Sequence, residues 1–107
     1  MGIYPEWWKL ESMSIRQWDM IDHLIIERDP YCRGVVLLGL AAPVEKLAEA
    51  FRAARYSKVC RGFMVGRTIF SEPSKMWLKN QIDDDELIQR VRAIFEELIN
   101  IWQRSRR

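Results

Sequence analysis

The sequence predicts an α/β fold in which the strands run parallel. Segments typical of strands and helices alternate three times along the chain, which is the pattern of successive βα units. The middle strand candidate, VVLLGL, is apolar throughout, as strands are when a parallel sheet is buried on both faces. The letters CRG precede this strand and recur 28 positions later in CRGFMVGRTIF, so the units themselves repeat.

Composition limits the kind of protein. The chain has 107 residues, of which 49% are hydrophobic and 30% charged, with a formal net charge of +2. These values fit one small domain with a modest core, and the basic residues are too scattered for a nucleic-acid-binding surface. No apolar run reaches the ~20 residues that cross a bilayer, and MGIYPEWW lacks the start of a signal peptide. We expect a cytoplasmic protein that binds neither nucleic acid nor membrane.

The first βα unit begins with a short strand candidate at residues 7–11, which is rich in aromatic side chains. Ser14 followed by Gln17 is a capping-box pattern that predicts the start of a helix, and Pro30 ends the segment. The predicted helix has an apolar face of residues at helical spacing: Ile15, Trp18, Ile21 and Ile25.

The second unit joins the apolar strand to a helix that opens near Pro43, a residue suited to a first helical turn. The apolar face of this helix comprises Val44, Leu47, Ala48, Phe51 and Ala54. The third unit starts with the strand candidate 60–70, followed by Pro73 and a short amphipathic piece around Trp77. A long helix then begins at the acidic triplet 83–85, which suits the positive end of a helix dipole. Its predicted buried face comprises Leu87, Val91, Phe95, Leu98 and Trp102.

The repeat length favours one architecture. A period of 28 residues is close to the ~30 residues per unit of a (β/α)8 barrel. A doubly wound sheet is the alternative, although no G-x-G-x-x-G follows any strand candidate. Because three units cannot close a barrel, we expect the last three βα units, about strands six to eight, of a TIM barrel. Residues 1–107 would form one partial domain with no second domain.

A phosphate site is predicted where the last two strand candidates end. Gly39 and Gly66 fall at the carboxyl ends of these strands, where glycine lets the backbone approach a ligand closely. Arg67 adds a planar guanidinium that matches phosphate geometry. The alternative is structural: the glycines merely end strands, and Arg67 pairs with a surface carboxylate such as Glu72.

The first strand candidate holds the other candidate site. Side chains alternate along a strand, so Trp7, Lys9 and Glu11 are expected on one face, and Trp8 and Leu10 on the other. A lysine enclosed by aromatic rings is a better amine nucleophile for Schiff-base chemistry, and Glu11 would move protons. The alternative is a Lys-Glu ion pair at a strand end.

Other reactive side chains fit structural roles. Cys32 and Cys60 hold matching positions in the two repeats, which predicts reduced thiols at strand starts rather than a disulfide or a nucleophile. The single histidine, His23, lies in a predicted helix and has no cluster of carboxylates around it. We therefore expect neither a metal site nor a cofactor.

Three segments together are similar to a known protein family. GIYPEWWKLE, DPYCRGVVLLGL followed by Pro43, and GFMVGRTIF followed by Pro73 and Trp77 cover nearly the whole chain. They closely resemble the C-terminal part of the domain fused behind the kinase, 5-dehydro-2-deoxygluconokinase, in myo-inositol catabolism proteins of the IolC type. That domain is described as a 2-deoxy-5-keto-gluconate 6-phosphate aldolase.

The resemblance implies a TIM-barrel class I aldolase, a carbon-carbon lyase of carbohydrate metabolism. Such a lyase cleaves its phosphorylated keto sugar acid into malonate semialdehyde and dihydroxyacetone phosphate. The K-L-E letters are also similar to a K-V-E strand of tagatose-bisphosphate aldolases, which implies that Lys9 forms the Schiff base. The same comparison places Gly39, Gly66 and Arg67 near the substrate phosphate.

The chain begins just ahead of the sixth expected strand of that family. The resemblance therefore implies a separately encoded barrel portion or kinase domain as partner, or self-association into a homo-oligomer. Two alternatives remain open: a non-catalytic sugar-phosphate-binding module, and an interaction fragment without any ligand.

Overall fold

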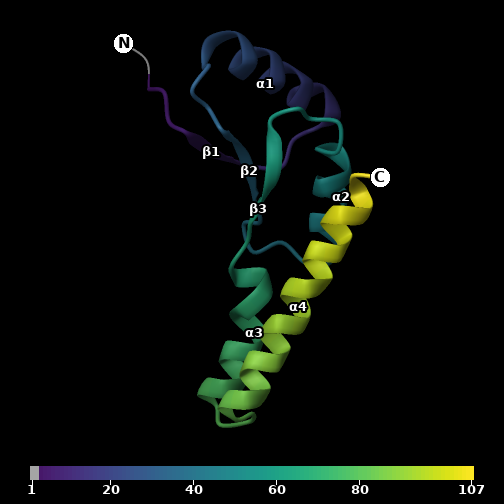
Figure 1. The fold of residues 1–107 in the computed structure, drawn as a ribbon. Helices are drawn as coiled ribbons and strands as arrows, with labels where there is room; N and C mark the ends of the chain where they lie inside the picture. The colour runs from purple at the N-terminus through teal and green to yellow at the C-terminus, as the bar shows by residue number, and fades with distance from the viewer. Residues whose placement is uncertain (1–2) are drawn as a thin grey trace.

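The computed structural model describes residues 3–107 (Figure 1). Met1 and Gly2, which open the N-terminal stretch discussed above, lie outside the described residues. The elements follow one another as β1 (Trp7–Leu10), α1 (Ile15–Arg28), β2 (Gly34–Leu38), α2 (Val44–Ala53), β3 (Cys60–Met64), α3 (Arg67–Leu78) and α4 (Asp84–Ser105).

The three strands form one parallel sheet in the order β1-β2-β3. Lys9 of β1 lies opposite Val36 of β2, which in turn lies opposite Gly62 of β3. The register shifts between Val35 and Val36, which leaves Arg61 as an extra residue in β3. All three strands therefore point their carboxyl ends toward the same edge of the sheet.

The core lies on one face of this sheet. Val35 and Leu37 are fully buried, whereas Val36 and Leu38, which point the other way, are only half-buried. The buried apolar residues come from the sheet and all four helices: Trp18, Ile25, Val35, Leu37, Leu47, Ala50, Phe51, Ala54, Val59, Cys60, Ile69 and Leu98. One sheet face is thus covered by helices, and the other stays partly open.

Aromatic side chains fix α4 against α2 and β3. The ring of Phe51 lies 5.1 Å from that of Phe63 and 5.2 Å from that of Trp102, between ring centroids. Arg106 stacks on Trp102 and donates hydrogen bonds to the carbonyl oxygens of Ala54, Arg55 and Cys60. The end of the chain is therefore tied to the end of α2 and the start of β3.

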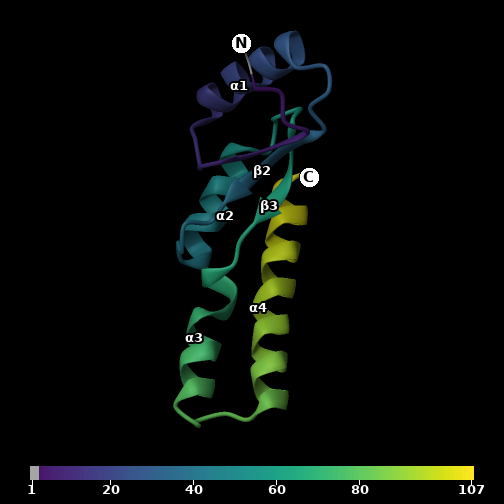
Figure 2. The same ribbon diagram turned by 90° about the vertical axis from the view of Figure 1, so that its left-hand side faces the viewer.

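Helices α3 and α4 form an antiparallel hairpin that extends well beyond the sheet (Figure 2). The turn between them is a Schellman motif: Asn80 adopts φ 58°, and the Gln81 N–H donates to the Met76 carbonyl at 2.9 Å. The carboxylate of Asp83 caps α4 by accepting from the Glu86 N–H at 2.8 Å. The predicted acidic start of the long helix is confirmed.

The α/β class and the parallel strands are confirmed, but the prediction of a TIM-barrel segment is wrong. The described residues form an open three-stranded sheet with β1 and β3 as its edges, accompanied by four helices. In a barrel each helix packs against the strands beside it. The 22 residues of α4 span about 33 Å, roughly twice the length of a five-residue strand, so half of the helix has only α3 to pack against.

The end of the third strand candidate is also different from the prediction. β3 stops at Met64, and residues 67–70 begin a helix that continues through Pro73 to Leu78. Thr68 and Ile69 favour strands intrinsically, but burial of Ile69 in the core and a hydrogen bond from Thr68 to Ala42 outweigh this preference.

Asp22 on α1 holds the start of β3 in place. Its carboxylate is buried and accepts hydrogen bonds from the Ser57 hydroxyl at 2.6 Å, the Lys58 N–H at 2.7 Å and the Val59 N–H at 3.3 Å. These contacts join residues more than thirty positions apart. The sequence pattern did not distinguish Asp22 from its surface neighbours.

Replacing this carboxylate should destabilise the fold. Asp22→Ala leaves three donors without their acceptor, so we expect the free energy of unfolding to fall by about 2–3 kcal/mol. Asp19→Ala, which removes an exposed carboxylate of the same helix, should change it by less than about 0.5 kcal/mol. Urea denaturation followed by circular dichroism measures both, and equal losses would contradict the assigned role.

Candidate functional site

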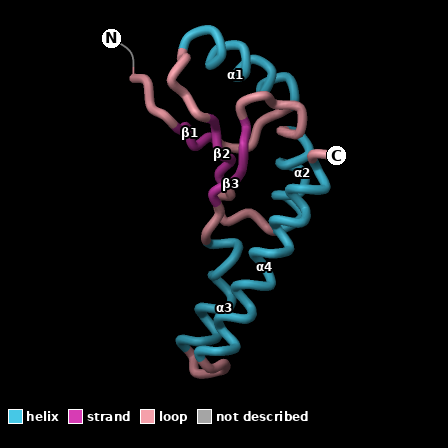
Figure 3. The backbone as a smooth tube through the Cα atoms, viewed as in Figure 1, coloured by secondary structure: helices cyan, strands magenta, loops and turns pink. Residues whose placement is uncertain are grey.

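Because the three strands are parallel, each leads from its carboxyl end into a short loop, and the loops after β2 and β3 lie together below the sheet in Figure 3. We call this region the loop edge; it consists of residues 11–14 after β1, 39–43 after β2 and 65–66 after β3. Ligands of parallel sheets bind outside the carboxyl ends of the strands. The predicted residues Glu11, Gly39 and Gly66 lie in these loops, and Arg67 follows directly.

The loops after β2 and β3 are in direct contact. A Cβ atom placed on Gly39 would lie 3.0 Å from both methyl groups of Val65, so no larger residue fits without moving that side chain. The Thr68 hydroxyl donates to the Ala42 carbonyl at 2.5 Å. These contacts bring Gly39 and the segment that carries Gly66 and Arg67 together.

The turn that follows Gly39 is strained. Leu40 and Ala41 have φ values of 50° and 60°, and the Ala42 N–H donates to the Gly39 carbonyl at 3.0 Å. Positive φ at both central positions defines a type I′ turn, which normally uses glycine, asparagine or aspartate. Such conformations cost about 1–3 kcal/mol per residue and concentrate at functional sites. Strain at the end of the central strand therefore points to this edge as a site.

Arg67 is the first residue of α3, and Gly66 is its N-cap. Within the described residues no side chain caps this helix end, and its first turn contains no acidic residue. A cation at the positive end of a helix dipole is unfavourable, so the arrangement gains from a bound anion. The pairing of Arg67 with Glu72, the alternative in the sequence, does not form: Glu72 lies 3.5 Å from the Lys75 amine instead.

Lys9 lies within β1, and Glu11 is the first residue of the loop that follows this strand. The predicted alternation is confirmed, because Trp8 and Leu10 pack against the core while Trp7 and Lys9 are exposed on the open face of the sheet. Lys9 is not enclosed by aromatic rings as expected.

Arg61 and Trp7 lie side by side on the same open face. A Cβ atom on Gly34 would lie 2.9 Å from side-chain carbon atoms of both residues. The open face therefore carries two cations, Lys9 and Arg61, on apolar surroundings.

A pocket of about 480 Å³ opens beside Gly39, between the loop after β1, the end of β2 and helix α2. Lys46 lines it together with Ser12 and Leu40. Sequence analysis missed Lys46, although its place three residues after Pro43 in the first turn of α2 was an available signal. Glu49 lines the same pocket, and its carboxylate lies 3.8 Å from the Lys46 amine, so the pair adds no net charge near Gly39.

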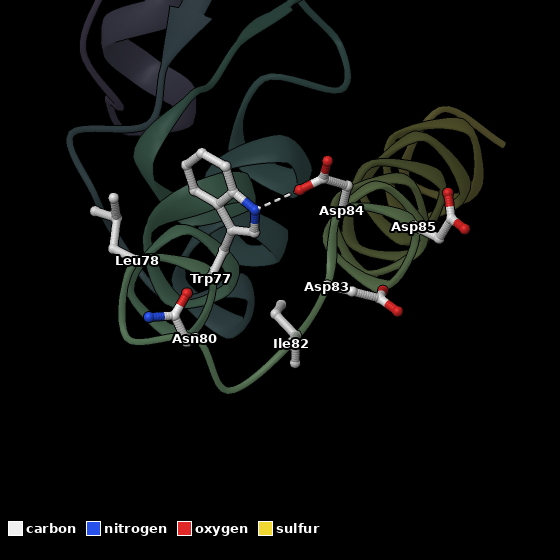
Figure 4. Close-up of a pocket in the computed structure, with 7 residues that line it drawn as sticks. All are labelled: Trp77, Leu78, Asn80, Ile82, Asp83, Asp84 and Asp85. Carbon is white, nitrogen blue, oxygen red and sulfur yellow. Dashed lines mark hydrogen bonds between the residues drawn. The ribbon is translucent and has the colours of Figure 1, made fainter.

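Another pocket lies at the tip of the α3–α4 hairpin (Figure 4). It has a volume of about 690 Å³ and is lined by Trp77, Leu78, Asn80, Ile82 and the acidic residues 83–85. The Trp77 indole N–H donates to the Asp84 carboxylate at 2.8 Å. Carboxylates repel an anionic ligand, so this pocket is not a candidate phosphate site.

The remaining predicted residues have structural surroundings. Cys60 is buried at the start of β3, and burial raises the pKa of its thiol, as expected for an unreactive cysteine. Cys32 is half-buried just before β2, and both thiols are free. His23 is exposed on α1, with Nδ1 2.9 Å from the Asp19 carbonyl oxygen.

The described residues lack a metal-binding cluster and a membrane-spanning helix. Residues 3–107 contain no group of three or more His, Cys, Asp or Glu side chains placed to hold a metal ion. Within the same range, no helix is long and apolar enough to span a bilayer.

The fold defines an α/β protein with an open parallel sheet, and Arg67 lies beside the loops at its carboxyl edge. The chain belongs to a family described as an uncharacterized protein conserved in bacteria (DUF2090), whose model matches residues 1–106. Neither a curated protein nor a solved structure matches the chain. The family description names no activity, and the resemblance to an aldolase domain stays a prediction.

Strain in the loop edge can be measured directly. Ala41→Gly relieves a left-handed backbone conformation, so we expect the free energy of unfolding to rise by about 0.5–1 kcal/mol. The matched change Ala93→Gly, at an exposed position inside α4, should lower it by about 1 kcal/mol. Thermal and urea unfolding of both variants test the assignment; a loss in Ala41→Gly would show that the turn is unstrained.

Proposed function

We propose that this protein binds a phosphorylated keto sugar acid at the loop edge, with Arg67 holding the phosphate. The observation that carries the proposal is the position of Arg67 at the uncapped first turn of α3, beside the contact between Gly39 and Val65. A helix N-terminus and an arginine together provide both N–H donors and full positive charge for a phosphate.

Residues in and beside the loop edge have separate roles in the proposed phosphate binding. The N–H groups of Arg67 and Thr68, the first two of α3, have no intrahelical acceptor and are available to phosphate oxygens, whereas that of Ile69 already donates to the Gly66 carbonyl at 2.8 Å. The guanidinium of Arg67 adds a fork of donors that matches two oxygens of the same group. Lys46 lies on the other side of Gly39, where it forms an ion pair with Glu49 at 3.8 Å and would exchange this partner for the ligand. The turn at Leu40 and Ala41 sets the backbone of the β2 loop for close approach.

A class I aldolase reaction on 2-deoxy-5-keto-gluconate 6-phosphate is the catalytic form of this proposal. In this form Lys9 and Arg67 serve the same ligand: β1 and β3 run parallel on either side of β2, and Lys9 lies level with Gly62, five residues before Arg67. The resemblance to the aldolase domain supports the reaction. On this basis we also place the protein in the cytoplasm and in myo-inositol catabolism.

In the proposed reaction Lys9 provides the amine that attacks the ketone, and Glu11 carries the proton. The amine attacks the ketone carbon and water leaves, which forms an iminium ion. When the carbon-carbon bond breaks, its electron pair moves into the iminium, while Glu11 accepts the proton of the hydroxyl group that becomes a carbonyl. Protonation of the resulting enamine and hydrolysis release the second product and restore the amine.

Binding without turnover is the second candidate, because the Lys9 side chain is exposed on the open sheet face. An exposed amine keeps its hydration and gains little nucleophilic strength. In that case the protein would be a sugar-phosphate-binding module that uses Gly39, Gly66 and Arg67 alone.

Phosphate binding predicts a stabilisation that depends on Arg67. Inorganic phosphate or dihydroxyacetone phosphate at ten times its Kd should add about 1.4 kcal/mol to the free energy of unfolding, raising Tm by several degrees. Arg67→Ala should lose most of this shift, and Arg92→Ala, an exposed arginine on α4, should keep it. Thermal unfolding is measured at constant ionic strength, with chloride as the reference anion. An equal rise in Tm in Arg67→Ala and Arg92→Ala would contradict the proposed site.

Schiff-base chemistry predicts a covalent adduct at Lys9. Borohydride added with dihydroxyacetone phosphate should reduce the imine and increase the mass of the chain by one adduct, mapped to Lys9 by peptide mass analysis. Lys9→Arg should give no adduct, and Lys58→Arg should react like the unchanged protein. A stabilisation dependent on Arg67 without any adduct would support binding without turnover.

A further inference from the structure

The molecule exposes more surface than a compact monomer of its mass. Its accessible surface is 7823 Å², whereas a folded monomer of 12.8 kDa exposes about 6,300 Å². Its radius of gyration is 16.2 Å, compared with roughly 13 Å for a compact domain of this length. The excess of roughly 1,500 Å² exceeds the ~800 Å² that each partner buries in a standard interface.

The projecting hairpin contributes much of this extended shape (Figure 1), and one of its sides is apolar. Phe70 and Trp77 of α3 are 45% and 40% exposed, and Ile88 and Phe95 of α4 are 63% and 45% exposed. We call these four residues the hairpin stripe. Although the Phe95 ring lies 6.4 Å from that of Phe63, nearly half of the Phe95 side chain and most of Ile88 stay uncovered by the described chain.

The four residues of the hairpin stripe lie on one side of the hairpin. Phe70 and Trp77 are seven positions apart, as are Ile88 and Phe95, and a spacing of seven keeps two residues on one helix face. The indole of Trp77 donates to Asp84, which lies one turn before Ile88 on α4. This bond places the exposed face of α3 beside that of α4.

We propose that the hairpin stripe is a homodimer interface, in which two copies pack their α3–α4 hairpins antiparallel into a four-helix arrangement. A two-fold axis that passes between residues 91 and 92 of α4, midway between the two apolar residues, sets Ile88 of each copy against Phe95 of the other. The same axis sets Phe70 near Trp77. A self-complementary pairing of large and small apolar groups results.

Charge favours this surface over the open face of the sheet. The open face carries Lys9 and Arg61, so two copies meeting there would bring like charges together. The hairpin stripe contains no charged residue, and the neighbouring carboxylate of Asp84 already accepts a hydrogen bond from Trp77. The stripe borders the loop edge, because a Cβ atom on Gly66 would lie 2.9 Å from the Phe70 ring, but none of its four residues is assigned to phosphate binding, so the dimer does not depend on the proposed function.

Sedimentation equilibrium of the full chain tests the proposal. We expect a dimer of twice 12.8 kDa, and a Kd at least about tenfold weaker in Ile88→Glu, because that change puts a charge in the interface. Leu24→Glu, at a 51% exposed position on α1, is the matched control and should remain dimeric. A monomer at all concentrations would overturn the proposal, as would a dimer that Ile88→Glu leaves intact.

Cross-linking tests the antiparallel pairing even if one variant is poorly folded. In a Cys32→Ser background, a mixture of Ile88→Cys and Phe95→Cys chains should form mixed disulfide dimers. Each variant alone should form few, because identical positions lie roughly 10 Å apart along the helix axis. Cross-links only between identical chains would overturn the antiparallel arrangement, and a dimer lost instead in Met64→Glu would assign the interface to the open sheet face.

Discussion

Parallel pairing of three short strands is the constraint on which the structure depends. Because β1, β2 and β3 all run in one direction, every connection must return along the sheet, and every strand delivers its next loop to the same edge. The glycines, Lys46 and Arg67 belong to separate segments of the chain and meet only for this reason. Had one strand been reversed, Gly39 and Arg67 would lie at opposite ends of the sheet.

Local signals in the sequence predicted most of the secondary structure. The capping box of Ser14 and Gln17 forms as expected, with both hydrogen bonds present, and Asp83 caps α4. Alternation along β1 separates Trp8 and Leu10 from Lys9 as predicted. These features depend on neighbours a few residues away, which is why spacing alone revealed them. Repeat spacing was a weaker guide, because a period of 28 residues fits an open sheet as well as a barrel.

Long-range contacts explain what the sequence did not reveal. The role of Asp22 depends on residues 57–59, and that of Arg106 on the end of α2, so neither has a local pattern. Residues 67–70 looked like a strand, but the bond between Thr68 and Ala42 and the burial of Ile69 place them in a helix. Because these residues are helical, Arg67 lies at the N-terminus of α3, whose dipole and free N–H groups favour the proposed phosphate. The strain at Leu40 and Ala41 had no signal, since neither residue type favours positive φ.

The central claim is that a phosphate binds where the loops after β2 and β3 touch. The most direct measurement is an NMR titration of the ¹⁵N-labelled chain with dihydroxyacetone phosphate, with chloride at matched ionic strength as reference. The account predicts saturable shifts of the backbone amides of Gly39, Leu40, Arg67 and Thr68, with α1 and the hairpin tip unchanged. Shifts confined to other surfaces, or no saturable shifts, would contradict it.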